Sequence, residues 1–310
     1  MLNELKSTSF RNRIIWIILT FFLWYIILAE TAVYYFGEFL FDNFVFSNEM
    51  YFVVDMYTTL LASIAVYLIF CLIPKNRFLL KSLKPKQDTL KLLGTGILLG
   101  FATNFFCIVC ALIHGDIKLY FDASLSQIPF FLFAFISVMF QSASEELWCR
   151  GMLYERINVH YPVWVAVFVN GALFGLLHSF NPGITPLAMA GLILCGFSYS
   201  LLRWYSGSIW TCIGIHTMWN FTQNLIFGLP NSGLVSEASI WHLDAVTGIS
   251  NLIYDYSFGV EGAVPSLLMD GTLAVVIIVL AVRNGRIKEL TMSKEKEEKL
   301  KKEQTLNTQI

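Results

Sequence analysis

Long apolar stretches recur along this 310-residue chain, separated by short polar segments. A helix of about 20 such residues crosses the roughly 30 Å hydrocarbon core of a bilayer, since each residue adds about 1.5 Å. Inside a bilayer the backbone must satisfy its own hydrogen bonds, as a helix does. The stretches therefore predict an all-α polytopic membrane protein, a bundle of about eight transmembrane helices. We expect these helices at residues 13–36, 51–73, 91–114, 128–157, 162–180, 185–203, 208–228 and 263–282.

The composition supports a membrane protein. Hydrophobic residues make up 56% of the chain and charged residues 14%, and the mean hydropathy is +0.63. These values are far from those of a soluble domain. All six cysteines fall within apolar stretches, which indicates packing residues rather than a disulfide framework. The first stretch lacks a small-residue cleavage site, so we expect a retained anchor and not a signal peptide.

The basic residues divide unevenly between the loops. With the N-terminus inside, Lys118 is the one residue among 21 Lys and Arg that falls in an outer loop. Basic residues favour the cytoplasmic side of a membrane. This asymmetry predicts a multi-pass protein of the cell membrane with both termini cytoplasmic. The inner residues are Lys6, Arg11, Arg13, Lys75, Arg77, Lys81, Lys84, Lys86, Lys91, Arg150, Arg156, Arg203 and those of the C-terminal tail.

Four regions follow from this pattern. Residues 1–127 hold the N-terminal transmembrane helices and a basic cytoplasmic loop, and 128–233 form a core with the motifs described below. Residues 234–287 hold an outer segment and the last transmembrane helix, and 288–310 form a charged cytoplasmic tail. Residues 229–262 contain no Lys or Arg, and either lie along the outer surface or fold back as a lid. We expect Glu30, Asp55 and Asp270 near the outer ends of their spans, reaching water by snorkelling.

The fourth stretch contains the residues that most need explaining. Residues 128–141 carry no charge, yet Glu145, Glu146 and Arg150 follow within the same helix. An ionisable residue at that depth costs roughly 2.5 to 3.5 kcal/mol on insertion scales, and therefore indicates a functional site. Glu146 and Arg150 are four residues apart, so they share a helix face and can pair, which leaves Glu145 free. Taken alone, this cluster is explained equally well by a buried ion pair that fixes helix packing.

A hairpin places a histidine at the same depth as the free carboxylate. Tyr161 and Pro162 mark a tight turn between the fourth and fifth stretches. Glu145 precedes this turn by about 15 residues and His178 follows it by about 17, so both lie roughly 22 to 26 Å from the bend. We therefore expect the two side chains to face each other at one level of the bilayer. Phe174 is four residues from His178 and shares its helix face.

The seventh stretch adds a third polar pair at the same spacing, His216 and Asn220. Imidazoles hold a water or a metal, a desolvated carboxylate suits general-base work, and an amide donates to a developing oxyanion. Together the three pairs predict hydrolysis at a carbonyl. The chain has no HExxH, GxSxG, intramembrane Asp pair or glycine-rich phosphate loop. Zincins, serine esterases, presenilin-like proteases and NTPases therefore each lack their defining feature here.

The three pairs, in this order on successive spans, resemble the signature motifs of the CPBP (Abi) family, which includes CAAX prenyl endopeptidases and bacteriocin-processing or immunity proteins. The patterns EExxxR, FxxxH and HxxxN are all intact, and the resemblance covers about residues 130–233. The matching residues are Glu145, Glu146, Arg150, Phe174, His178, His216 and Asn220.

The resemblance implies a role for each residue. Glu145 would activate water, His178 and His216 would position it, and Asn220 would complete the site. Glu146 and Arg150 would orient the site, with Phe174 beside them. Family members are described both as metalloproteases and as glutamate-type proteases. His178, His216 and Glu145 could thus bind Zn²⁺ with an open position, or clamp a water without metal.

Three classes of protein compete for this sequence. The first is an intramembrane endopeptidase that cleaves a membrane-associated peptide or protein within the lipid bilayer, with no nucleic-acid partner. The substrate would be of the prenylated or the bacteriocin type. The second is a non-catalytic membrane regulator or bacteriocin-immunity protein that binds a membrane partner, and the third is a proton or metal transporter. Intact motifs favour the enzyme, and a transporter would place polar residues at several depths of one route.

Overall fold

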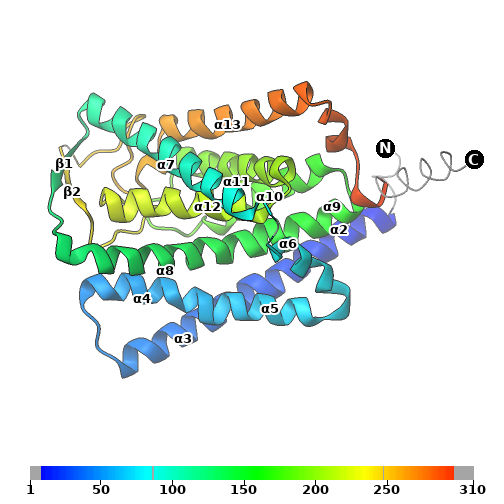
Figure 1. Cartoon of the computed structure of the whole chain (residues 1–310), viewed down its shortest axis with the longest axis horizontal. Coiled ribbons are helices and arrows are strands. Elements are labelled where there is room, and N and C mark those ends of the chain that lie inside the picture. Colours follow the sequence, from blue (N-terminus) through cyan, green and yellow to red (C-terminus); the bar gives the residue numbers. More distant parts are fainter. Residues whose placement is uncertain (1–7, 86, 247, 297–310) are drawn as a thin grey trace, which may run out of the picture.

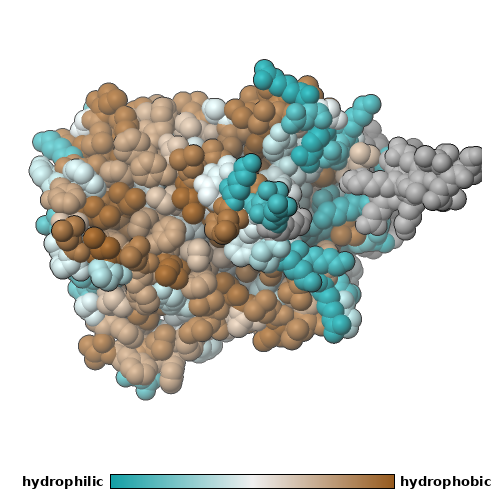
Figure 2. Space-filling view, viewed as in Figure 1, coloured by the Kyte–Doolittle hydropathy of each residue, from teal (hydrophilic) through white to brown (hydrophobic). Residues whose placement is uncertain are grey.

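The structure is a computed structural model that describes residues 8–85, 87–246 and 248–296. Helices run roughly along the long axis of the molecule, and a small sheet lies at one end (Figure 1). We call this end the sheet end. At the opposite end helix α2 begins and helix α13 ends, and hydrophilic residues gather there (Figures 1 and 2). Seven Lys and Arg residues line a cavity at this end, so we call it the basic end. The all-α prediction is therefore confirmed.

The first two spans form a helical hairpin. Each contains a short π-helical segment within an otherwise continuous helix. The first span runs past the predicted residue 36 to Asn43, so Glu30 lies in its middle and not near its outer end as expected. The elements are α2 (Thr8–Phe21), η1 (Phe22–Ala29), α3 (Glu30–Asn43), α4 (Asn48–Thr59), η2 (Leu60–Ile64), α5 (Ala65–Leu72), η3 (Pro74–Leu79) and α6 (Leu80–Leu83).

The remaining elements include the spans that carry the three motifs. The fourth span is one long helix in three parts, and Tyr161 and Pro162 end it as predicted. The elements are α7 (Thr89–His114), β1 (Ile117–Phe121), η4 (Leu125–Gln127), α8 (Ile128–Glu146), η5 (Leu147–Leu153), α9 (Tyr154–His160), α10 (Val163–Leu177), α11 (Pro186–Ser206), α12 (Ile209–Phe221), η6 (Thr222–Ile226), β2 (Trp241–Ala245), η7 (Val260–Gly262), α13 (Val264–Arg283) and η8 (Ile287–Thr291).

Helices occupy all eight predicted stretches, but within the described residues six are long and apolar enough to cross a membrane. The other two are α10, a 15-residue apolar helix, and α12 with η6. Helix α10 ends at Leu177 because the chain turns just after it. The α12–η6 segment contains His216, Asn220, Gln223 and Asn224, which lower its hydropathy. The two helices that are too short or too polar to be counted as membrane spans thus both carry motif residues.

Apolar side chains cover much of the surface between the two ends of the bundle. Figure 2 shows hydrophobic residues over the middle of the visible face and hydrophilic ones toward the basic end. Large apolar side chains on the outside include Leu98, Leu132, Phe168 and Val275, each more than half exposed. In a protein that crosses a membrane, such a surface contacts lipid.

Close helix packing fixes the position of α12. A Cβ atom on Gly100 of α7 would lie 2.3 Å from the Ile215 carbonyl oxygen, and one on Gly96 would lie 2.2 Å from that of Thr211. These two helices therefore touch through their backbones, as small residues permit in membrane bundles. Gly94, which shares this helix, has no neighbour at its Cβ position and plays no such part.

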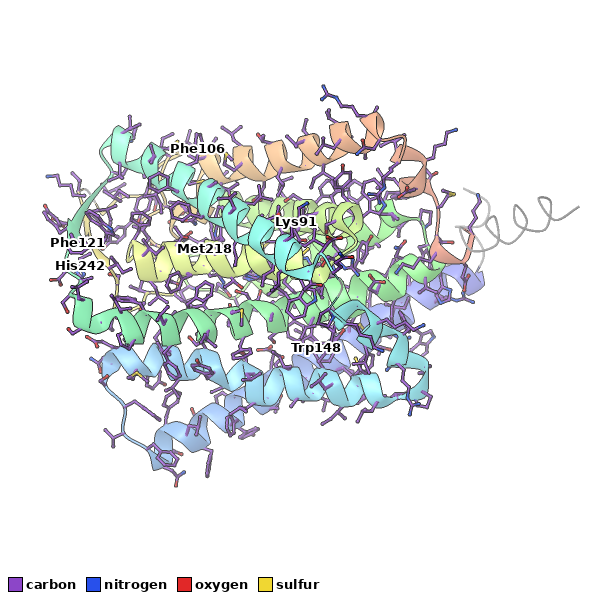
Figure 3. All side chains as sticks on the ribbon, viewed as in Figure 1. Lys91, Phe106, Phe121, Trp148, Met218 and His242 are labelled. Atoms are coloured by element: carbon purple, nitrogen blue, oxygen red, sulfur yellow. The ribbon has the colours of Figure 1, made fainter. Side chains whose placement is uncertain are left out.

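The expected outer segment folds back over the end of the bundle. Its strand β2 pairs antiparallel with β1, so that Phe121 lies opposite Trp241 and Tyr120 opposite His242 (Figure 3, where Phe121 and His242 are labelled). Leu229, before β2, and Val260, after it, are fully buried. The lid alternative left open by the sequence is thus the one observed, and we call residues 229–246 and 248–262 the cap.

Candidate active site

A cavity of about 110 Å³ lies inside the bundle, where the three motif helices meet the cap. Helices α8, α10 and α12 bring the motif residues to it, α4 and α11 contribute apolar walls, and the cap closes one side. Its lining includes Glu145, His178, His216, Asn220 and Phe174. The structure therefore brings together side chains that lie up to 75 residues apart in the sequence.

The two histidines converge on Glu145. The His178 Nε2 atom lies 4.0 Å from Glu145 Oε2, and the His216 Nε2 atom lies 3.9 Å from the same oxygen. The Glu145 side chain is 19% exposed and those of the histidines 15% and 10%. Glu145 and His178 thus lie at one level, as the hairpin argument predicted. The separations exceed a direct hydrogen bond, and leave room for a small group between the three atoms.

Hydrogen bonds on the far side of each ring fix the orientation of both histidines. The His178 Nδ1 atom lies 2.8 Å from the Phe174 carbonyl oxygen, and the His216 Nδ1 atom lies 2.9 Å from Glu146 Oε1. Because these partners only accept, each Nδ1 carries a proton and donates it. In the neutral tautomer the two Nε2 atoms are therefore unprotonated, and both face Glu145.

Glu146 links the first motif to the third. Its Oε1 accepts from Arg150 Nη1 at 2.9 Å as well as from His216, and both Glu146 and Arg150 are completely buried. The Arg150 guanidinium lies 4.4 Å from the centre of the Phe174 ring, within cation–π range. It also donates to the Gly196 carbonyl at 3.4 Å. The predicted pairing of Glu146 with Arg150 is observed, and Phe174 contacts both the arginine and His178.

Gln141 is a site residue that sequence reasoning missed. Its Nε2 donates to Glu145 Oε1, and its Oε1 accepts from Asn220 Nδ2 at 3.2 Å. Gln141 therefore connects the amide of the third motif to the carboxylate of the first. It donates to Oε1 of Glu145, whereas the histidines lie near Oε2. The available signal was its position four residues before Glu145, a spacing at which side chains meet on a helix.

The cap and α13 supply two further carboxyl groups to the cavity. Glu261 accepts from Trp219 Nε1 at 2.7 Å and from the Ser232 hydroxyl at 2.6 Å. Burial raises the pKa of Glu261, and the hydrogen bonds from Ser232 and Trp219 oppose this rise. Asp270 was expected to snorkel to water, and this is wrong. It is 7% exposed, lines the cavity and accepts from Ser198, because α13 turns this side chain toward α11.

The described residues contain no group of three or more His, Cys, Asp and Glu side chains placed to hold a metal ion. His178, His216 and Glu145 offer suitable donor atoms, but both histidine nitrogens lie about 4 Å from the Glu145 oxygen. Zinc ligands at about 2.0 to 2.2 Å in tetrahedral geometry would lie closer to one another. As placed, these three side chains do not fit a zinc site.

Comparison with protein families agrees with the motifs. Residues 127–222 match the family described as type II CAAX prenyl endopeptidase Rce1-like. The matched segment runs from the start of α8 to the start of η6, and so includes all the motif residues. The predicted resemblance to the CPBP family is thus confirmed, and this family indicates a CAAX-type intramembrane protease. A search of curated proteins found no match to the chain.

Replacing Gln141 by Ala tests its part as a positioning residue. Glu145 would lose a charge-assisted hydrogen bond and Asn220 its partner, and a hydrogen bond to a charged group contributes about 1.5 to 3 kcal/mol. We expect kcat for peptide cleavage to fall roughly 10-fold or more, with KM and protein abundance nearly unchanged. A parallel loss of folded protein, or a change confined to KM, would contradict this role.

Proposed function

We propose that the chain is an intramembrane endopeptidase in which Glu145 activates a water molecule held between Glu145, His178 and His216. The observation that supports this most directly is the convergence of both Nε2 atoms on one Glu145 oxygen, at 3.9 and 4.0 Å. A water in that space can donate one hydrogen bond to Glu145 Oε2 and the other to a histidine Nε2, which leaves a lone pair on its oxygen for attack. The buried Glu146–Arg150 pair holds His216 in the tautomer that this arrangement needs.

The reaction uses the side chains of the chain itself. Glu145 takes a proton from the water while the water oxygen forms a bond to the peptide carbonyl carbon. The Asn220 amide has two N–H protons and gives one to Gln141, so the other is available for the developing oxyanion. Glu145 then returns the proton to the leaving nitrogen as the C–N bond breaks. The products are a new carboxyl group and a new amine.

The substrate we propose is a membrane-associated peptide of the CAAX type. The family match and the position of the cavity inside a lipid-facing bundle both support such a substrate. The test is to incubate the purified protein in detergent with a farnesylated peptide that ends in a CAAX sequence, beside its unprenylated twin. Mass spectrometry should find a cut after the prenylated cysteine. If no membrane peptide is cut, a role in binding, such as immunity, becomes the better account.

Metal dependence can be decided in the same assay. Because the three donor side chains do not fit a zinc site as placed, we propose that cleavage is indifferent to chelators. Incubation with 1,10-phenanthroline or EDTA should leave the rate of cleavage unchanged. Loss of activity that added Zn²⁺ restores would instead support a metal held by His178, His216 and Glu145.

We also propose that both termini are cytoplasmic and that the chain lies in the cell membrane. The ends of the described chain lie together at the basic end (Figure 1), and basic residues favour the cytoplasmic side. Single cysteines placed at Lys81 and at Asp244, in a background without reactive thiols, should react with a membrane-impermeant maleimide from opposite sides. Labelling of both from the same side of intact cells would contradict this topology.

A further inference from the structure

A second and larger cavity, of about 1040 Å³, opens at the basic end of the bundle. Its walls come from α2, η3, α6, α9 and the end of α11, and residues 286–295 pass along one side. It shares no lining residue with the cavity of the candidate active site. The proposed peptidase chemistry makes no use of it.

The lining of this cavity is strongly basic. It contains seven Lys and Arg residues against three Glu residues, a surplus of four positive charges. The basic residues are Arg13, Lys75, Lys81, Arg156, Arg203, Arg286 and Lys294. Such a concave arrangement of one sign of charge concentrates anions.

Each of the three carboxylates is already paired with a basic side chain. Glu155 accepts from both Arg203 and Lys294, Glu289 pairs with Arg286 at 3.0 Å, and Glu295 pairs with His160 at 2.8 Å. Arg13 Nη1 lies 2.9 Å from His160 Nδ1, and among the described residues Lys75, Lys81 and Arg156 have no carboxylate partner within 4 Å. Three of the basic side chains that line the cavity, Lys75, Lys81 and Arg156, are therefore available to a bound anion.

Two buried arginine nitrogens in the lining of the cavity also lack acceptors. Within the described part of the chain, the Nε atoms of Arg156 and Arg203 are buried and have no hydrogen-bond partner, and Arg203 as a whole is 6% exposed. Buried donors nearly always have a partner in folded proteins. The protein itself therefore leaves a donor on each of these two lining arginines without an acceptor.

The rim of the cavity is in reach of the bilayer. Trp16 of α2 lines the cavity and is 67% exposed, and its neighbours Ile15 and Leu19 are also exposed apolar residues. Tryptophan at the end of an apolar span is typical of the interface between membrane and water. Basic pockets between helices at this level bind the headgroups of anionic lipids.

We propose that this cavity binds the phosphate-bearing headgroup of an anionic phospholipid, whose acyl chains lie along α2 beside Trp16. Lys75, Lys81 and Arg156 contact the phosphate, and the walls provided by α9 and α11 hold the remainder of the headgroup. The site thus ties the basic end of the protein to an anionic leaflet.

The test is native mass spectrometry of the purified protein titrated with phosphatidylglycerol or with phosphatidylcholine. The variant is the double substitution Lys75→Gln, Lys81→Gln. Its matched control is Lys84→Gln, Lys91→Gln, which removes the same charge from exposed positions that follow closely in the sequence and do not line the cavity. Lys91 lies at the start of α7, nearer the middle of the bundle (Figure 3).

We expect the protein to bind phosphatidylglycerol at least about 10-fold more tightly than phosphatidylcholine. The Lys75, Lys81 variant should lose about 10-fold of that affinity and the control less than about 3-fold, since basic residues act on an anionic headgroup over a short range. Equal losses in the two variants, or no preference between the lipids, would overturn the proposal. So would displacement of phosphatidylglycerol by millimolar inorganic phosphate with the same lysine dependence, since the ligand would then be a free anion.

Discussion

Replacing Glu145 by Gln should reduce peptide cleavage by at least about 100-fold while the protein still folds. The substitution preserves the shape of the side chain and its contact with Gln141, but removes the base that accepts the proton from water. General-base catalysis typically contributes about 10² to 10⁴-fold. The measurement is the rate of cleavage by purified protein, normalised to the amount of folded protein in a size-exclusion profile.

The histidines provide the controls for this prediction. His178→Ala and His216→Ala should be comparably inactive, and the double variant Glu145→Gln, His178→Ala should be little worse than either single change, because residues that act as a unit are not additive. His114→Ala is a matched control, since His114 lies outside the cavity and pairs with Asp116. Cleavage that survives at the normal rate in Glu145→Gln would remove this residue from the mechanism.

Replacing Arg150 by Ala should lower stability by roughly 3 to 5 kcal/mol, because it leaves the Glu146 carboxylate buried without its cation. Both side chains are completely buried, and Glu146 also fixes His216. We expect little folded protein in membranes and a large fall in its melting temperature in detergent. Arg283→Ala, at an exposed position, should change stability by no more than about 0.5 kcal/mol.

A double variant separates lost charge balance from lost packing. In Arg150→Met, Glu146→Gln the uncompensated charge is gone, so folded protein should recover in large part. Activity should not recover, since His216 would lose the carboxylate that orients it. Normal abundance of Arg150→Ala alone would mean that the pair is not buried in the membrane-embedded protein.

The parts of the site that the sequence predicts are those that depend on one helix or one hairpin. Four-residue spacing predicts the contact of Glu146 with Arg150, since both side chains lie on one face of the same helix. The turn at Pro162 predicts the common depth of Glu145 and His178, because the rise per residue is fixed. Both are observed, at 2.9 Å and 4.0 Å.

The parts that it does not predict depend on how helices rotate against one another. The bond from His216 to Glu146 joins α12 to α8, and α12 also packs against α7 at Gly100; the spacing within one helix reveals neither contact. The same is true of Asp270, whose apolar helix gave no sign of which side faces α11. Gln141 is different. Its four-residue spacing from Glu145 is visible in the sequence, but it was not predicted as a site residue because it carries no charge.

In the proposed mechanism, water held by Glu145 and the two histidines attacks the peptide carbonyl directly. The most direct measurement is a single turnover in H₂¹⁸O, followed by mass spectrometry of the products and of the enzyme. Direct attack predicts one ¹⁸O atom in the new carboxyl group of the cleaved peptide and none in the Glu145 side chain. A product without ¹⁸O, together with ¹⁸O in Glu145, would show that the carboxylate itself attacks and would contradict the account.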